Sequence, residues 1–161
     1  MIFGDLIFGL GIPIPLRSYS SLLIAARLLL PIVTKMPFKM LYPTGSEQEK
    51  EPKPKYEKYY READIIAGDY LFIRKYLPEN MSGKWIMTNT VTQADVTFLK
   101  SRGIEKLIVT TPEFEGRSFG TNVMEATLVS VIGKPWERIS PQEYVAMLKK
   151  LDFKPRIETL N

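Results

Sequence analysis

Short apolar runs separated by amphipathic stretches recur along the chain. Leu107, Ile108 and Val109 form one such run, which is typical of a strand buried in a parallel sheet. The helical spacing between such runs predicts an α/β fold, a three-layer sandwich with helices on both faces of a Rossmann-like parallel sheet. The predicted strands lie near residues 2–5, 63–68, 84–89 and 106–111.

Capping residues mark where several helices should begin and end. Thr92–Asp95, Asn122–Glu125 and Ser140–Glu143 each have capping-box spacing, in which the first side chain binds the backbone N–H three residues later. Gly103 follows the last apolar residue of the helix expected to begin near Thr92, and Gly133 follows that of the helix expected to begin near Asn122. Each glycine should therefore end its helix.

Other segments are set apart by their composition. Residues 18–34 predict a helix whose leucines cover so much of its circumference that we expect burial on more than one side. Thr44–Lys58 instead combines charged residues, Pro and Gly, which predicts a flexible charged loop at 44–58.

With 161 residues, the chain is expected to form a single domain, 1–161. Residues 70–77 should form a short helix, and 153–160 a closing strand or an extended tail.

The composition excludes several kinds of chemistry. The sequence has no cysteine and no histidine, so it offers no disulfide, thiol nucleophile, cysteine zinc site or histidine base. The net charge of +4 comes from interspersed acidic and basic residues, so we expect no nucleic-acid partner. Charged residues and prolines interrupt the apolar opening, and no run reaches the ~20 residues of a spanning helix. We therefore expect no membrane partner and a cytoplasmic location.

Polar residues follow several of the predicted strands. Right-handed crossovers place the carboxyl ends of parallel strands along one edge, so these residues should share a ligand-facing edge. The polar loop at 112–122 should join them, because it is longer than a usual βα connection and long loops tend to be functional. We expect one candidate ligand site here, made of Asp5, Gly68, Asp69, Asn89, Thr90 and Thr110 with Ser118, Gly120, Thr121, Asn122 and Glu125.

Structural alternatives remain open for some of these residues. Capping alone explains the position of Glu125, and we favour that interpretation. Asp5 could equally accept hydrogen bonds from neighbouring backbone N–H groups, as Asp often does after strands. Gly116 and Gly120 could serve only to shape the loop.

Several segments resemble a known enzyme family. Residues 63–103, which begin ADIIAGD, and residues 116–128, which begin GRSFGTNVMEA, resemble the cofactor-binding half of the shikimate/quinate dehydrogenase superfamily. Together with FGDLIFGLGIPIPL at 3–16, they are also similar to bacterial proteins labelled quinate 5-dehydrogenases. In this comparison Val96–Gly103 match a helix of the family, and Glu125 lies near the place of a substrate-contacting Gln.

The resemblance implies the NAD(P)-binding part of a quinate/shikimate dehydrogenase-like oxidoreductase. The implied cofactor is NAD or NADP, which would contact Asp5, Gly68, Asp69, Asn89, Thr90 and Thr110. The implied small-molecule substrate would contact Ser118, Gly120, Thr121, Asn122 and Glu125. Asp5 favours NAD, because a carboxylate at the end of a second Rossmann strand accepts hydrogen bonds from the ribose hydroxyls and repels the extra phosphate of NADP.

The sequence also departs from this family. It contains no G-x-G-x-x-G or G-x-G-G-A loop to hold a pyrophosphate, and the family's catalytic Lys and Asp belong to an amino-terminal domain that these residues do not match. On this interpretation 1–161 is an incomplete Rossmann-like domain whose sheet lacks its first strand. Whether the chain is an enzyme stays open, and we expect it to be inactive alone.

Two other functions remain open. One is a non-catalytic binding or assembly module. The other is a small-anion sensor that uses the strand carboxyl ends and the 112–122 loop, with Arg117 as the counter-charge. The unpaired edge expected beside Met1–Asp5 predicts a homo-oligomer, a companion chain or a missing amino-terminal domain as the partner.

Overall fold

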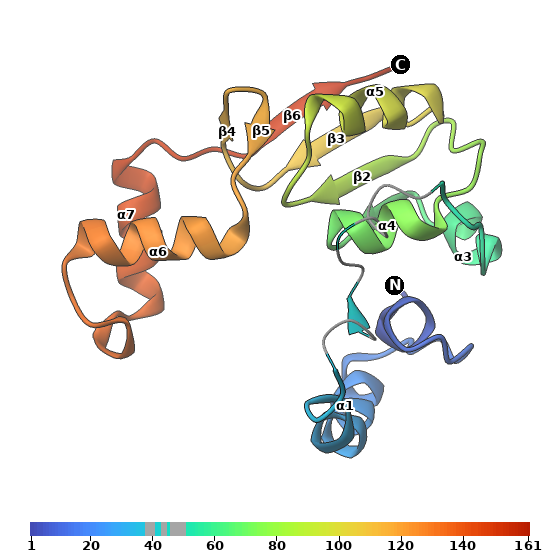
Figure 1. Cartoon of the computed structure of the whole chain (residues 1–161), viewed down its shortest axis with the longest axis horizontal. Coiled ribbons are helices and arrows are strands. Elements are labelled where there is room, and N and C mark those ends of the chain that lie inside the picture. The colour runs from blue at the N-terminus through green and yellow to red at the C-terminus, as the bar shows by residue number, and fades with distance from the viewer. Residues whose placement is uncertain (38–40, 43–44, 46–50) are drawn as a thin grey trace. The chain divides into compact units, whose positions relative to one another are not determined.

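The computed structural model describes residues 1–37, 41–42, 45 and 51–161 (Figure 1). The described residues form two compact units, where the length of the chain predicted one domain. Unit 1 comprises Met1–Tyr60 and Leu71–Pro78, and unit 2 comprises Arg61–Tyr70 and Glu79–Asn161.

Unit 2 contains a four-stranded sheet in the order β1-β2-β3-β6. The first three strands are parallel to one another, and β6 pairs antiparallel with β3. The strands are β1 (Ile65–Ala67), β2 (Trp85–Thr88), β3 (Lys106–Val109) and β6 (Arg156–Thr159). The three predicted internal strands are therefore confirmed, and the closing segment is the antiparallel edge strand. The protein has a mixed α/β fold.

One face of this sheet carries the core of unit 2. The side chains of Ile86, Leu107 and Val109 are fully buried on that face. They share the interior with Val96 and Leu99 of α5 (Gln93–Ser101), the helix between β2 and β3. The predicted capping box of α5 is confirmed, since the Thr92 hydroxyl accepts from Asp95 N and the Asp95 carboxylate accepts from Thr92 N at 2.9 Å.

The opposite face of the sheet is largely exposed. Met87 pairs with Ala67 on one side and Ile108 on the other, and Ile108 pairs with Ile157, so these side chains form a row across the four strands. Ile65, Met87 and Ile157 are 50%, 36% and 65% exposed. Alternate side chains of these strands therefore lie exposed on this face. The mixed α/β fold is confirmed, and the three-layer sandwich stays a prediction.

The segment after β3 is a hairpin and not an irregular loop. β4 (Glu113–Phe114) and β5 (Arg117–Ser118) pair antiparallel around a two-residue turn. Both turn residues, Glu115 and Gly116, have positive φ, as the favoured hairpin turns require.

Two helices of unit 2 follow this hairpin. α6 (Thr121–Ile132) ends at Gly133, which has positive φ as predicted. Its N-cap is Gly120, so the predicted Asn122–Glu125 capping box is wrong, and Asn122 already lies inside the helix. α7 (Pro141–Lys150) follows the short 3₁₀-helix η3 (Trp136–Arg138) and has the predicted Ser140–Glu143 capping box.

Unit 1 is helical among its described residues. The predicted strand at 2–5 is wrong, because Asp5–Gly9 forms a π-helix, η1, and only an isolated bridge links Phe3 to Leu16. α1 (Tyr19–Val33) confirms the predicted amino-terminal helix, and its N-cap is Ser18. Most of α3 (Glu57–Glu62) and α4 (Tyr70–Tyr76) also belong to this unit.

Aromatic side chains pack together in unit 1, beside buried aliphatic residues such as Ile7 and Leu77. Phe8 packs edge-on against Tyr60, with ring centroids 5.3 Å apart, and also contacts Tyr76 at 5.6 Å. The Tyr60 hydroxyl donates to the carbonyl of Ile73 at 3.1 Å. Burial, with a smaller contribution from Tyr76, raises the pKa of Tyr60 above its usual value. Tyr60 is thus a structural residue that links α3 to α4.

Two further predictions concern α1 and the segment 44–58 of unit 1. α1 has no buried residue, so the expected burial on more than one side is wrong. The charged loop predicted at 44–58 falls partly outside the described residues, because 44 and 46–50 are not among them. Its remainder includes the start of α3, which begins at Glu57.

Candidate functional site

Polar side chains of unit 2 meet at the carboxyl edge of its parallel strands. Asn89 directly follows β2, and its side-chain amide donates to the hydroxyl of Thr121 at 3.1 Å. Thr121 is the first residue of α6, so this hydrogen bond joins the end of a strand to the start of a helix. It brings together one residue predicted to bind a cofactor and one predicted to bind a substrate.

Threonines hold the ends of β2 and β3 in register. The backbone N–H and the hydroxyl of Thr110 both donate to the carbonyl of Thr88, at 2.9 and 3.2 Å. The hydroxyl of Thr111 donates to the carbonyl of Asn89. Because these bonds fix the chain on both sides of Asn89, its amide is held in place by the sheet.

The β4–β5 hairpin also lies against this edge. Ser118 N donates to the carbonyl of Val91 at 3.0 Å, and Phe119 N donates to the carbonyl of Pro112 at 2.8 Å. The Ser118 side chain is buried, and its hydroxyl has no hydrogen-bond partner within the described part of the chain. A buried hydroxyl of this kind is a candidate donor to a ligand atom.

The amino-terminal end of α6 has no side-chain cap. Gly120 occupies the N-cap position without a side chain to bind the first N–H groups of the helix. These N–H groups carry a partial positive charge and favour an anion or a phosphate. The edge therefore combines hydroxyls, an amide and free backbone donors, which suit an oxygen-rich ligand.

Arg156 is a charged residue at this edge that the sequence analysis did not select. It begins β6 and pairs in register with Val109, the last residue of β3. Its guanidinium contacts Glu113, and its Nε atom lies 2.8 Å from a carboxylate oxygen of Glu158. The antiparallel pairing of β6 was the missing information, because it returns the start of the strand to the carboxyl edge of β3.

The other predicted cofactor residues take different positions. Gly68 N donates to the carbonyl of Met87 at 3.0 Å, so Gly68 lies at the end of β1. Asp69 is half-buried immediately before α4, and Thr90 is exposed after β2. Asp5 is exposed at the start of η1 in unit 1 and does not follow a strand. Asp5 therefore gives no reason to favour NAD over NADP.

The remaining predicted substrate residues lie on α6. Asn122 and Glu125 are exposed side chains within its first two turns, and Glu125 does not cap the helix. The side chain of Arg117, the proposed counter-charge, lies outside the described part of the chain.

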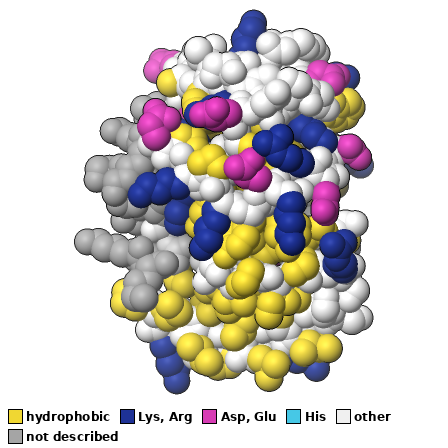
Figure 2. Space-filling view, turned by 90° about the vertical axis from the view of Figure 1, so that its right-hand side faces the viewer, with side chains coloured by type: hydrophobic (Ala, Val, Ile, Leu, Met, Phe, Trp, Pro, Cys, Tyr) yellow, Lys and Arg dark blue, Asp and Glu magenta, His cyan; other side chains and the backbone are white. Residues whose placement is uncertain are grey.

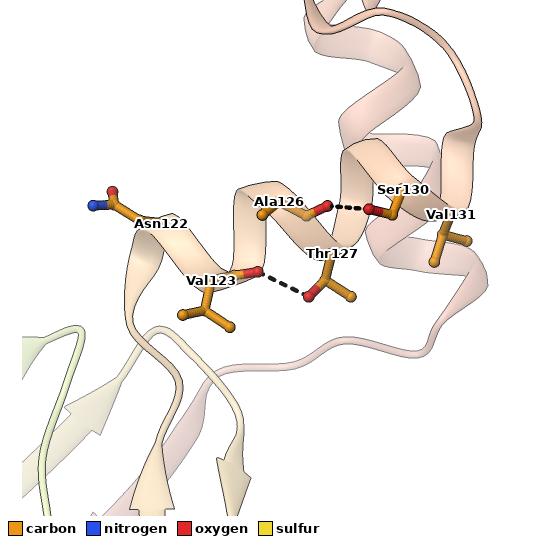
Figure 3. A pocket seen from close by; sticks show the side chains of 6 residues that line it. All are labelled: Asn122, Val123, Ala126, Thr127, Ser130 and Val131. Carbon is orange, nitrogen blue, oxygen red and sulfur yellow. Dashed lines mark hydrogen bonds between the residues drawn. The ribbon is translucent and has the colours of Figure 1, made fainter.

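A shallow, open hollow runs along the exposed side of α6 (Figure 3). Its lining residues come from this one helix: Asn122, Val123, Ala126, Thr127, Ser130 and Val131. The hydroxyls of Thr127 and Ser130 donate to carbonyls of their own helix, at 2.8 and 2.9 Å. The hollow therefore offers mainly methyl groups, and its polar end is Asn122, beside Thr121.

Neither acidic clusters nor shifted pKa values add a catalytic group to this edge among the described residues. Among residues 1–37, 41–42, 45 and 51–161, no group of three or more acidic side chains could hold a metal ion. The carboxyl of Glu143, whose pKa is lowered to about 2 by its hydrogen bond to Lys134 and by Ser140, belongs to the cap of α7. Its low pKa has a structural cause and does not mark an acid–base pair.

Comparison with known proteins adds a family without a known activity. Residues 1–160 match the model of a family described as a domain of unknown function, DUF8754, and the chain belongs to this family. No curated protein and no solved structure matches the chain.

Proposed function

We propose that unit 2 binds a small phosphorylated ligand of the nucleotide class at the carboxyl edge of its sheet. In this proposal the unit is the NAD(P)-binding part of a quinate/shikimate dehydrogenase-like oxidoreductase. Three parallel strands that follow one another in sequence, with helices between them, support this proposal.

The position of the resembling segments supports this proposal. The ADIIAGD segment supplies β1 and the residues that lead into α4, and GRSFGTNVMEA supplies β5 and the start of α6. Nucleotide ligands of parallel α/β sheets bind outside the strand carboxyl ends, with phosphate at a helix amino terminus. Unit 2 has both the carboxyl edge of a parallel sheet and an uncapped helix start beside it.

The hydrogen bond between Asn89 and Thr121 is the observation on which the proposal rests. It holds an amide and a hydroxyl beside the uncapped first turn of α6. Each group has further hydrogen-bonding capacity. The amide carries a second N–H, its carbonyl oxygen accepts from the Thr88 hydroxyl at 3.4 Å and keeps a second lone pair, and the Thr121 hydroxyl keeps its proton to donate. A phosphate or ribose oxygen could therefore bind without breaking the existing contact.

We expect weak binding and no turnover by this chain alone. Without a glycine-rich loop, the pyrophosphate loses several backbone hydrogen bonds, each worth about 0.5–1.5 kcal/mol net. Hydride transfer also needs a base within hydrogen-bond reach of the substrate hydroxyl. An assay of NAD- and NADP-dependent oxidation of quinate and shikimate tests the absence of turnover.

Calorimetric titration with NAD⁺, NADP⁺, ADP and inorganic phosphate tests the binding proposal. We expect saturable binding of at least one nucleotide, weakened about fivefold by Asn89→Ala and by Thr121→Val, for the loss of one hydrogen bond each. Thr97→Val is the matched control, because the Thr97 hydroxyl bonds only to its own helix, α5, at 3.1 Å. Binding of none of these ligands, or equal binding by all variants, would contradict the proposal.

An assembly role is the second candidate, favoured by the exposed sheet face. The row formed by Ala67, Met87, Ile108 and Ile157 carries no charge. It is therefore compatible with a two-fold contact, in which the same patch meets itself. We propose that a second copy of the chain covers this face and gives the expected homo-oligomer.

Light scattering at several concentrations tests the second copy. We expect a dimer that Ile157→Lys dissociates, because each subunit would then place a lysine against the other. Val145→Lys, at a valine of α7 that is 50% exposed against 65% for Ile157, is the control and should leave the dimer intact. A stable monomer at high concentration would contradict this role.

A further inference from the structure

α1 is an apolar helix with large exposed side chains. Ile24, Leu28 and Ile32 are spaced four residues apart, so they form one stripe along the helix, and they are 61%, 70% and 62% exposed. Leu23 and Leu30 are exposed in a second stripe. Figure 2 shows hydrophobic side chains gathered at the lower end of the face that it draws, where Figure 1 shows α1.

The charged residues within α1 and next to it along the sequence have one sign. Arg27 lies between the two apolar stripes, and Arg17 and Lys35 lie just outside the two ends of the helix. All three side chains are exposed. Residues 6–46 contain four basic residues and no acidic residue. The surface that covers α1 should therefore be both apolar and negatively charged.

A second copy of the chain does not fit this description. In a two-fold contact through α1, the helices cross near their midpoints, and Arg27 lies close to the middle of the 15-residue helix. The two Arg27 guanidiniums would meet near the axis, and residues 6–37 offer no carboxylate to separate them. Like charges placed in this way disfavour the contact.

We infer that α1 binds to the surface of an anionic lipid bilayer, with its axis along the membrane plane. The exposed leucines and isoleucines enter the boundary between headgroups and acyl chains, and Arg17, Arg27 and Lys35 pair with lipid phosphates. Tyr19, which is exposed at the first turn, suits the headgroup level, where aromatic rings are favoured.

This mode of attachment differs from spanning a membrane. No helix among the described residues is both long and apolar enough to cross a bilayer. Our expectation of no membrane partner rested on the length of apolar runs, which bears on spanning alone. A helix that lies on the surface needs one apolar side and basic residues, and α1 has both.

Vesicle flotation tests this inference with the full chain. We expect binding to vesicles of 70% phosphatidylcholine and 30% phosphatidylglycerol, weak binding to pure phosphatidylcholine, and release by salt. Arg27→Glu should weaken binding about thirtyfold, since each charge near the surface contributes about fivefold and the change removes one and adds one of opposite sign. Leu28→Asp should weaken it further, whereas Val131→Asp, at an exposed valine of α6, should not.

A single fluorescent label gives a second measurement that avoids a disruptive substitution. The chain has no cysteine, so Leu28→Cys can be labelled at one site with a polarity-sensitive dye. We expect a blue shift on adding the anionic vesicles, and none with label at Val131→Cys. The inference is overturned if the vesicles do not bind, if Leu28→Asp binds equally well, or if Leu28→Asp only dissolves a dimer formed without lipid.

Discussion

The side-chain amide of Asn89 donates a hydrogen bond to the Thr121 hydroxyl at 3.1 Å, across 32 residues of sequence. The chain between these two residues contains α5, β3 and the β4–β5 hairpin, so the bond forms only when these elements have folded. It therefore links the integrity of the fold to the geometry of the candidate site, and substitutions at its two ends should affect stability and ligand binding together.

The energetic coupling of this pair can be measured with a double-mutant cycle. Asn89→Ala, Thr121→Val and the double variant should show a coupling of about 0.5–1.5 kcal/mol in the free energy of unfolding. Urea denaturation provides the measurement, and the same cycle with Asn89→Ala and Thr97→Val should show none. A coupling near zero for the first cycle would mean that the bond is not formed in solution.

The cap of α7 should contribute measurably to stability. The Ser140 hydroxyl accepts from Glu143 N at 3.4 Å, and the Glu143 carboxylate accepts from Ser140 N at 2.9 Å. Ser140→Ala should therefore cost about 1 kcal/mol in thermal or urea unfolding. Ser130→Ala is the control within α6 and should be neutral or slightly stabilising, because alanine favours helix more than serine. Equal effects of the two substitutions would count against the cap.

The same glutamate predicts a change in stability at acid pH. The hydrogen bond from Lys134, with those from Ser140, lowers the pKa of Glu143 from 4.5 to about 2. A carboxyl whose pKa is lowered on folding stabilises the folded state at pH values above its pKa in the unfolded chain. This stabilisation is lost as the pH falls from about 4.5 toward 2. Thermal unfolding should show a steeper acid loss for the natural chain than for Glu143→Gln. Identical profiles would contradict the shift.

Two glycines with positive φ should respond differently to alanine. A Cβ on Gly103 would lie 2.8 Å from the Ser82 hydroxyl oxygen and 3.3 Å from Ser82 N, whereas one on Gly133 would meet nothing within 4 Å. Gly133→Ala should cost about 1 kcal/mol for the left-handed backbone alone, and Gly103→Ala should cost more. Urea unfolding of both variants measures the difference, and a larger loss for Gly133→Ala would contradict this account.

Local signals in the sequence predicted much of unit 2. The apolar runs located β1, β2 and β3, and the residue pairs Thr92–Asp95 and Ser140–Glu143 located two helix starts, because caps depend on neighbouring residues alone. The Asn122–Glu125 pair has the same spacing, but Gly120 takes the N-cap position one residue before the helix begins at Thr121. Spacing alone cannot choose between adjacent starts.

Features that depend on distant contacts were missed. An apolar run at 2–5 looks like a strand, but no neighbouring strand pairs with it, and the chain turns into η1. The β4–β5 hairpin was interpreted as a loop, because Glu115, the first residue of its turn, is not one of the residues that usually take positive φ there. The exposure of α1 could not be predicted, because an apolar helix suits a protein core and a lipid surface equally well.

The candidate site was predicted in part. Asn89 and Thr121 were both selected from sequence, and the structure joins them directly. Asp5 was selected because of a strand that does not form, and Arg156 was overlooked because its position depends on the antiparallel direction of β6. The end of a strand can be located from neighbouring residues in the sequence. Which later residues, such as Arg156, lie beside that end depends on the topology of the sheet.

The most direct test of the central claim is a titration of the ¹⁵N-labelled chain with NAD⁺ and NADP⁺, followed by NMR. The proposal predicts that the side-chain amide of Asn89 and the backbone N–H groups of residues 121–123 shift together along one saturable curve. These groups lie at the carboxyl edge of the sheet and at the start of α6. Unchanged signals at saturating nucleotide, or shifts confined to unit 1, would contradict a ligand site at this edge.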